Sequence, residues 1–227
     1  MHSLKKLALI AVAATLMGSS AQAAPTSWDM PAGDNGAYTY SQGQTANNKF
    51  ESGTAFSGGF FFAPSDFKAQ ASNGHDEASD TLSVILNAKP NNSFTRISSN
   101  LLGDYTILGS GAVNATGALR VTNLDTAMTL TSPLSFGGTV PVATLSSADG
   151  IFQGGNALEL PAGWTNIRVE LDGMLTADAL NGSSLIQMKD AEIAVATAEI
   201  PLPAAAFVAP LAAFFGWRAK KKFGAAR

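Results

Sequence analysis

The chain has 227 residues, 14% of them charged, no cysteine and two histidines, a composition that excludes disulfides, thiol catalysis and zinc sites. Seven of the fourteen basic residues lie in the two terminal segments. Residues 24–199 therefore carry seven basic against seventeen acidic residues, a net charge of about −10. A surface of that sign repels phosphate backbones, which excludes nucleic-acid binding.

Residues 1–23 have the three-part layout of a secretory signal peptide. Two lysines precede an apolar stretch from Leu7 to Met17, and Ala21 and Ala23 occupy the two positions that a signal peptidase must accommodate. We expect cleavage after Ala23, because a cut one residue later would place Pro25 directly behind the scissile bond. The alternative is an uncleaved anchor, but the apolar stretch would rise only about 16 Å as a helix.

Residues 24–199 alternate apolar and polar side chains in short runs that end at Gly, Asn or Asp, which is typical of strands and turns. In NIRVELDG (166–173) the odd-numbered apolar residues face one way, and Arg168, Glu170 and Asp172 face the other. We expect Asp172-Gly173 to turn the chain. About nine to eleven such runs are present.

Long helical periods are absent from this stretch, and only APSDFKAQAS and TADALNG have room for one or two helical turns. We therefore expect an all-β fold, a single antiparallel β-sandwich of jelly-roll or immunoglobulin-like topology. In the last predicted strand, Ile186 and Ile193 have opposite parity. A bulge near Lys189 and Asp190 would let both face inward.

His75, in the polar run SNGHDEASD, is the only histidine outside the signal peptide, so a Ser-His-Asp relay would have to use it. Asp76, Glu77 and Asp80 lie close to it in sequence and could form a catalytic triad or a metal site with it. The cluster of Ser, Asn, Gly and Asp predicts a turn instead, and we expect no catalytic residue. We also expect no cofactor; calcium is the one ion whose oxygen ligands the acidic turns AGDNG and SNGHDEASD offer, although they lack EF-hand spacing.

Carbohydrate binding usually shows as exposed aromatic side chains, and the candidates are Trp28, Trp164 and the run GGFFFAP. Within that run, alternation places Phe60 and Phe62 in the core and Phe61 outward. A glycosidase needs two facing carboxylates, and the sequence does not single out a pair.

Residues 200–227 contain an uncharged stretch from Ile200 to Trp217 that would rise about 27 Å as a helix, near the thickness of a bilayer core. We expect a weakly held transmembrane helix, because prolines interrupt it. A basic tail follows and would stop transfer, which leaves the acidic domain exported. The tail residues are Arg218, Lys220, Lys221 and Lys222.

The motif Ile200-Pro201-Leu202-Pro203-Ala204, the apolar stretch and the basic tail, paired with an N-terminal signal peptide, resemble the PEP-CTERM sorting signals of Gram-negative bacteria. The subtype is the one written VPLPA, with Ile in place of Val. This resemblance implies recognition by an exosortase, a membrane-embedded cysteine transpeptidase-like enzyme. It also implies delivery to the cell surface, in association with extracellular polysaccharide and biofilm matrix. The alternative is a plain anchor that no enzyme processes.

These observations divide the chain into a signal peptide (1–23), an exported domain (24–199) and a sorting signal (200–227). We expect a non-enzymatic surface or matrix protein with a binding or structural role. Its partners would be signal peptidase, exosortase, the membrane before processing, and extracellular polysaccharide. The alternative is a secreted carbohydrate-active enzyme on the same scaffold.

Overall fold

The computed structural model describes residues 24–136 and 142–200. All regular secondary structure in these residues is β-strand. Every strand pairing is antiparallel, so the predicted all-β antiparallel fold is confirmed for these residues. The strands are β1 (Thr26–Ser27), β2 (Gly33–Asp34), β3 (Tyr38–Thr45), β4 (Thr54–Phe56), β5 (Gly59–Phe62), β6 (Lys68–Ser72), β7 (His75–Ala88), β8 (Asn92–Asn123), β9 (Thr129–Pro133), β10 (Ser135–Phe136), β11 (Val142–Thr144), β12 (Ala148–Trp164) and β13 (Asn166–Glu199).

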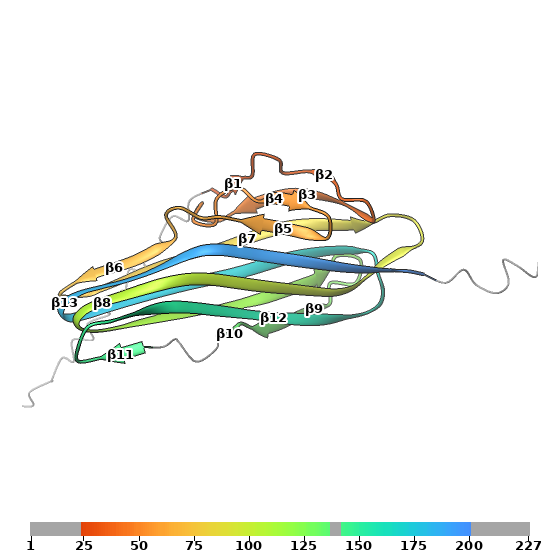
Figure 1. Ribbon diagram of the computed structural model, residues 1–227. Helices are drawn as coiled ribbons and strands as arrows, with labels where there is room; N and C mark the ends of the chain where they lie inside the picture. The colour runs from red at the N-terminus through yellow and green to blue at the C-terminus, as the bar shows by residue number, and fades with distance from the viewer. Residues whose placement is uncertain (1–23, 137–141, 201–227) are drawn as a thin grey trace, which may run out of the picture.

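The two longest strands, β8 and β13, pair with each other along nearly their whole lengths and bend together halfway. Gly109 and Gly182 face each other at the bend, with φ of 88° and 109°. A Cβ on Gly182 would lie 1.9 Å from the carbonyl oxygen of Leu108, so only glycine allows this close approach. The bend lies at the end of the molecule where β6 and β11 are labelled in Figure 1, which we call the bend end.

Strand neighbours change across the bend, and the sheet is thereby folded into two layers (Figure 1). The first layer contains β3, β7, the first half of β13, the second half of β8, and β9. The second contains β5, β6, the second half of β13, the first half of β8, and β12. Strands that pass from one layer to the other in this way form the corners of a β-sandwich.

The core lies between the two layers and is closed by aromatic contacts across them. Tyr40 of the first layer meets Phe60 of the second at a ring-centroid distance of 5.1 Å, and Tyr38 meets Phe94 at 5.8 Å. These rings pack edge to face, the arrangement that aromatic quadrupoles favour. A β-sandwich is therefore the fold of the described residues.

The bulge predicted near Lys189 is confirmed by a register shift between Met188 and Asp190, which keeps Ile186 and Ile193 both buried. The predicted turn at Asp172-Gly173 is wrong, because β13 runs on through it with partners on both sides. A Cβ on Gly173 would lie 3.0 Å from a ring carbon of Phe50, so this glycine makes room for core rings.

The two stretches with room for helical turns contain no helix, and each contributes residues to a strand. Lys68–Ser72 forms β6, and TADALNG (176–182) forms the bend of β13. The predicted strands DYTILGSG and GALRVTNL are likewise parts of one strand, β8. Pairing with neighbouring strands decided the conformation of these stretches, which local composition left open.

The signal-peptide residues Ala21 and Ala23, the motif residues from Pro201 to Ala204, and the basic tail from Arg218 to Lys222 lie outside the described residues. Ile200 is the last residue described, and its backbone N–H donates to the carbonyl oxygen of Asn91 at 2.7 Å. In residues 24–136 and 142–200, no helix is long and apolar enough to span a membrane.

Candidate functional site

His75 lies in strand β7 rather than in the predicted loop, because only Asn73 and Gly74 turn the chain there. Its Nδ1 lies 2.7 Å from Oδ1 of Asp178 on β13, a residue 103 positions away. Hydrogen bonding to Asp178 raises the pKa of His75 above its usual 6.5, with smaller contributions from the charges of Asp178, Glu77 and Asp76.

Other residues that could take part in a relay with this histidine have hydrogen-bond partners of their own. Ser184 is buried and donates its hydroxyl to the carbonyl oxygen of Asp178 at 2.7 Å. Asp76 accepts from the backbone N–H of Gln70 at 2.7 Å. Asp80 lies five residues along the strand from His75, about 17 Å away.

Asp80 has a structural role, since its side chain is buried and its carboxylate holds the loop that follows β3. Oδ1 accepts from the N–H of Asn47 at 2.7 Å, and Oδ2 from the N–H groups of Lys49 at 2.7 Å and Phe50 at 2.9 Å. We call residues 46–50 the clamped loop. Buried carboxylates of this kind fix a backbone because the loop amides have no other acceptor.

The acidic turns considered for calcium are engaged by protein groups. Asp34 of AGDNG accepts from the N–H of Gly36 and pairs with Lys89 at 2.7 Å. The described ranges hold no group of three or more His, Asp or Glu side chains that could bind a metal ion.

The prediction that two tryptophans are candidates for stacking on sugar rings is wrong. Trp28 and Trp164 are 3% and 5% exposed, and Trp28 packs against the rings of Phe60 and Phe62. The alternation predicted for GGFFFAP is confirmed, with Phe60 and Phe62 buried and Phe61 exposed. Of the predicted aromatic candidates, Phe61 therefore remains available at the surface.

The outer face of the first layer carries a polar hollow of about 390 Å³. Gln44 of β3, Ser83 of β7, Arg168 and Glu170 of β13, and Arg120 of β8 line it. These residues come together because the register sets Ser83, Glu170 and Arg120 in one row across three strands. Strand alternation turns all three away from the core.

A second hollow of about 490 Å³ lies next to the first on the same face. Ser79, Asp172, Met174 and Thr116 line it, and the clamped loop contributes Asn47. Both hollows include Ala46 and Thr81, so they join into one feature that we call the polar groove.

Arg120 forms ion pairs with two acidic residues at the centre of the polar groove. Its guanidinium lies 3.4 Å from a carboxylate oxygen of Glu170 and 3.0 Å from one of Asp172. Thr81 donates its hydroxyl to Asp172 at 2.7 Å. The charged side chains are therefore held in place before any ligand arrives, which lowers the entropic cost of binding.

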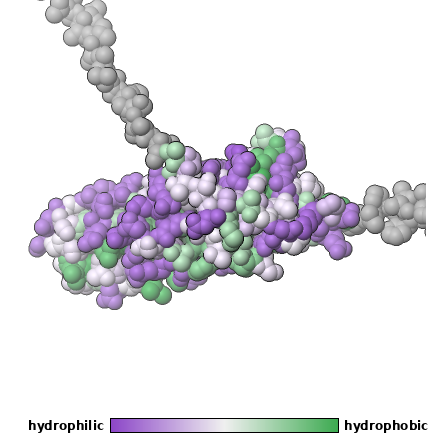
Figure 2. Space-filling model, turned by 90° about the horizontal axis from the view of Figure 1, so that it is seen from above, coloured by the Kyte–Doolittle hydropathy of each residue, from purple (hydrophilic) through white to green (hydrophobic). Residues whose placement is uncertain are grey.

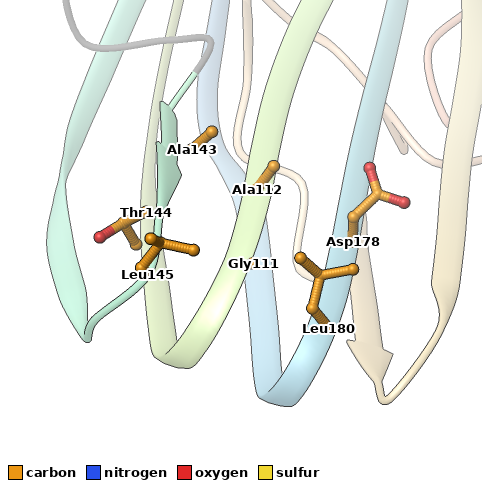
Figure 3. Close-up of a pocket in the computed structure, with 7 residues that line it drawn as sticks. All are labelled: Gly111, Ala112, Ala143, Thr144, Leu145, Asp178 and Leu180. Atoms are coloured by element: carbon orange, nitrogen blue, oxygen red, sulfur yellow. The ribbon is translucent and has the colours of Figure 1, made fainter.

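A third hollow, of about 450 Å³, lies at the bend end and is mainly apolar. Figure 3 shows Leu145 and Leu180 on either side of Gly111 and Ala112, on neighbouring bends of the chain. Both leucines are largely exposed, at 89% and 78%. In Figure 2 this end, at the left, carries green side chains among purple ones.

The sequence indicated only part of the polar groove. The shared outward direction of Arg168, Glu170 and Asp172 follows from alternation and is confirmed by their register. Arg120 and Thr81 could not be assigned to the same site, because the pairing of β13 with both β7 and β8 brings them there.

Comparisons with known proteins assign no family. No protein-family model matches the chain, and no curated protein does. Among solved structures, TmCBM61 in complex with β-1,4-galactotriose is 11% identical, with a TM-score of 0.23, over 72% of this chain and 93% of that one. The enzymatically active domain of bacteriophage CBA120 tailspike protein 4 is 11% identical, with a TM-score of 0.24, over 69% of this chain and 19% of that one. These TM-scores are too low to place the chain in a family.

Proposed function

We propose that this protein is a non-enzymatic polysaccharide-binding protein, exported and sorted to the cell surface or extracellular matrix. The observation that carries the binding role is the polar groove, which brings hydrogen-bond donors and acceptors together on one face. Arg120, Arg168 and the Gln44 amide can donate, and Glu170 and Asp172 accept. A sugar hydroxyl both donates and accepts, so a polyhydroxylated chain matches this lining.

The charge balance of the polar groove favours an uncharged ligand. Two guanidinium groups face the carboxylates of Glu170 and Asp172, and Arg120 engages both acids. The third carboxylate of the lining, that of Asp80, is buried and accepts backbone N–H groups. An anionic polymer would meet Glu170 and Asp172, whereas a cationic one would meet the arginines. Binding of a neutral sugar chain should accordingly depend little on ionic strength.

The sorting part of the proposal rests on the terminal sequences. The Ile200-Pro201-Leu202-Pro203-Ala204 motif follows directly after the last residue of β13. Exosortase processing at this motif would release the acidic domain from the membrane. Fractionation of cells that express the chain with and without residues 200–227 tests this route, and equal distribution of both forms would contradict it.

Affinity electrophoresis of the full chain in gels that contain soluble polysaccharides tests the binding role. The panel should hold neutral glucans, mannans and xylans, anionic polygalacturonate and cationic chitosan. We expect retardation by at least one neutral polymer, and its loss in Arg168→Ala. Arg96→Ala is the matched control, because Arg96 pairs with Glu159 on the second layer, away from the groove.

Absence of retardation by every neutral polymer would contradict the proposal. Release of new reducing ends by the wild type, lost in Glu170→Gln, would indicate the carbohydrate-active enzyme instead. That alternative draws on the two carboxylates Glu170 and Asp172, which lie side by side on one strand face.

A structural role is the second candidate, favoured by the exposed leucines of the bend end. Leu108, Leu145 and Leu180 are all more than half exposed, an unusual concentration of large apolar side chains at one end of a β-sandwich. Light scattering at raised concentration should then show self-association that Leu145→Asp with Leu180→Asp abolishes. A monomer at all concentrations would count against this role.

A further inference from the structure

We propose that the polar groove takes a linear, uncharged polysaccharide that lies along strand β13, with a strong subsite over Glu170 and a weaker one over Met174. This inference rests on the proposed function and adds to it the direction of the bound chain and the division of the site. It concerns only residues on the outer face of the first layer.

The direction follows from the positions of the two hollows. The first is lined on β13 by Arg168 and Glu170, and the second by Asp172 and Met174. Six residue steps along a strand cover about 20 Å, so the joined groove is long and parallel to β13. A polymer that crossed the strands instead would use one hollow and leave the other empty.

The two subsites differ in chemistry. In the first, Arg168, Glu170 and Gln44 offer charged and amide groups to sugar hydroxyls. Charge-assisted hydrogen bonds are about twice as strong as neutral ones. In the second, the Asp172 carboxylate is already engaged by Arg120 and Thr81, which leaves the hydroxyls of Ser79 and Thr116 beside the apolar side chain of Met174.

The backbone around the groove is held in an unusual conformation. Gln42 lines the first hollow and has a φ of 54° at an irregularity of β3. The clamped loop borders the second hollow and is fixed by the buried carboxylate of Asp80. Strain of this kind persists only where the surrounding structure enforces it, and it is common at binding sites.

Chain-length dependence tests the inference. Isothermal titration of the full chain would use the di-, tri-, tetra- and hexasaccharide of the neutral polymer that retards it most strongly. Each hollow covers about 10 Å of β13, the length of roughly two sugar rings. We therefore expect the tetrasaccharide to bind about ten-fold more tightly than the disaccharide, and the hexasaccharide to add little.

Three tryptophan variants locate the subsites. Ser83→Trp fills the first hollow and should weaken binding of every oligosaccharide, because only the weaker second subsite is left. Thr116→Trp fills the second, and should lower tetrasaccharide affinity to the disaccharide level while leaving the disaccharide unaffected. Thr176→Trp is the matched control, because Thr176 lies on the same face of β13 but lines neither hollow.

The outcomes separate this inference from the function on which it rests. If no neutral oligosaccharide or polymer binds, the proposed function itself is wrong. If the polymer binds but the di- and tetrasaccharide have equal affinity, or Thr116→Trp behaves as Thr176→Trp does, the extended two-subsite arrangement is wrong and the binding role stands. Circular dichroism of each variant confirms that a loss of binding is not a loss of folding.

Discussion

Replacement of Asp80 by alanine should lower the free energy of unfolding by about 3–4 kcal/mol. The Asp80 carboxylate accepts from four backbone N–H groups, those of Asn47, Lys49, Phe50 and Thr81, at 2.7 to 2.9 Å. Each bond contributes about 1 kcal/mol net, and a buried donor left without a partner costs about 1–3 kcal/mol. Asp80 is 3% exposed, so water can replace the carboxylate only in part.

Urea denaturation of the full chain measures this loss. Asp80→Asn keeps one acceptor oxygen and should lie between the wild type and Asp80→Ala. Asp66→Ala is the control, because its carboxylate is exposed and pairs with Lys49 and Lys68 at the surface, where solvent screens such pairs and they add little to stability. If Asp80→Ala lowers the free energy of unfolding no more than Asp66→Ala does, Asp80 does not fix the clamped loop that borders the polar groove.

Two further changes test other parts of the fold. Asp178 raises the pKa of His75 above 6.5, so this pair stabilises the protein fully below about pH 6.5 and loses its effect as the pH rises through the folded-state pKa. His75→Gln should therefore make the melting temperature depend less on pH between about pH 5 and pH 9. A pH dependence equal to that of the wild type would contradict this. Gly182→Ala should destabilise by more than about 3 kcal/mol in urea, because its Cβ would collide with a backbone carbonyl. Gly74→Ala, which meets no atom within 4 Å, should cost little by comparison.

The fold class could be predicted because β-sheet formation leaves a local signal. Alternation in NIRVELDG assigned the inward and outward faces of β13, and a parity change placed the bulge at Lys189. Both are properties of one strand beside a single apolar core, so they can be read without knowing the partners.

The bend and the groove could not be predicted, because they depend on which strands become neighbours. Gly182 is required by the carbonyl of Leu108, 74 positions away, and Gly173 by core rings from the clamped loop and elsewhere. Asp172-Gly173 has the composition of a hairpin turn, yet pairing on both sides keeps it extended. The buried tryptophans were misassigned for the same reason, since local sequence does not show which edge of a sandwich is covered.

Amide chemical shifts of the ¹⁵N-labelled full chain, recorded as a neutral oligosaccharide is added, test the central claim most directly. We predict that the largest changes fall on Gln44, Thr81, Ser83, Glu170 and Met174, along one face of the first layer. Changes confined to the second layer, around Phe61 and Glu192, or to the bend end around Leu180, would contradict a polysaccharide site in the polar groove.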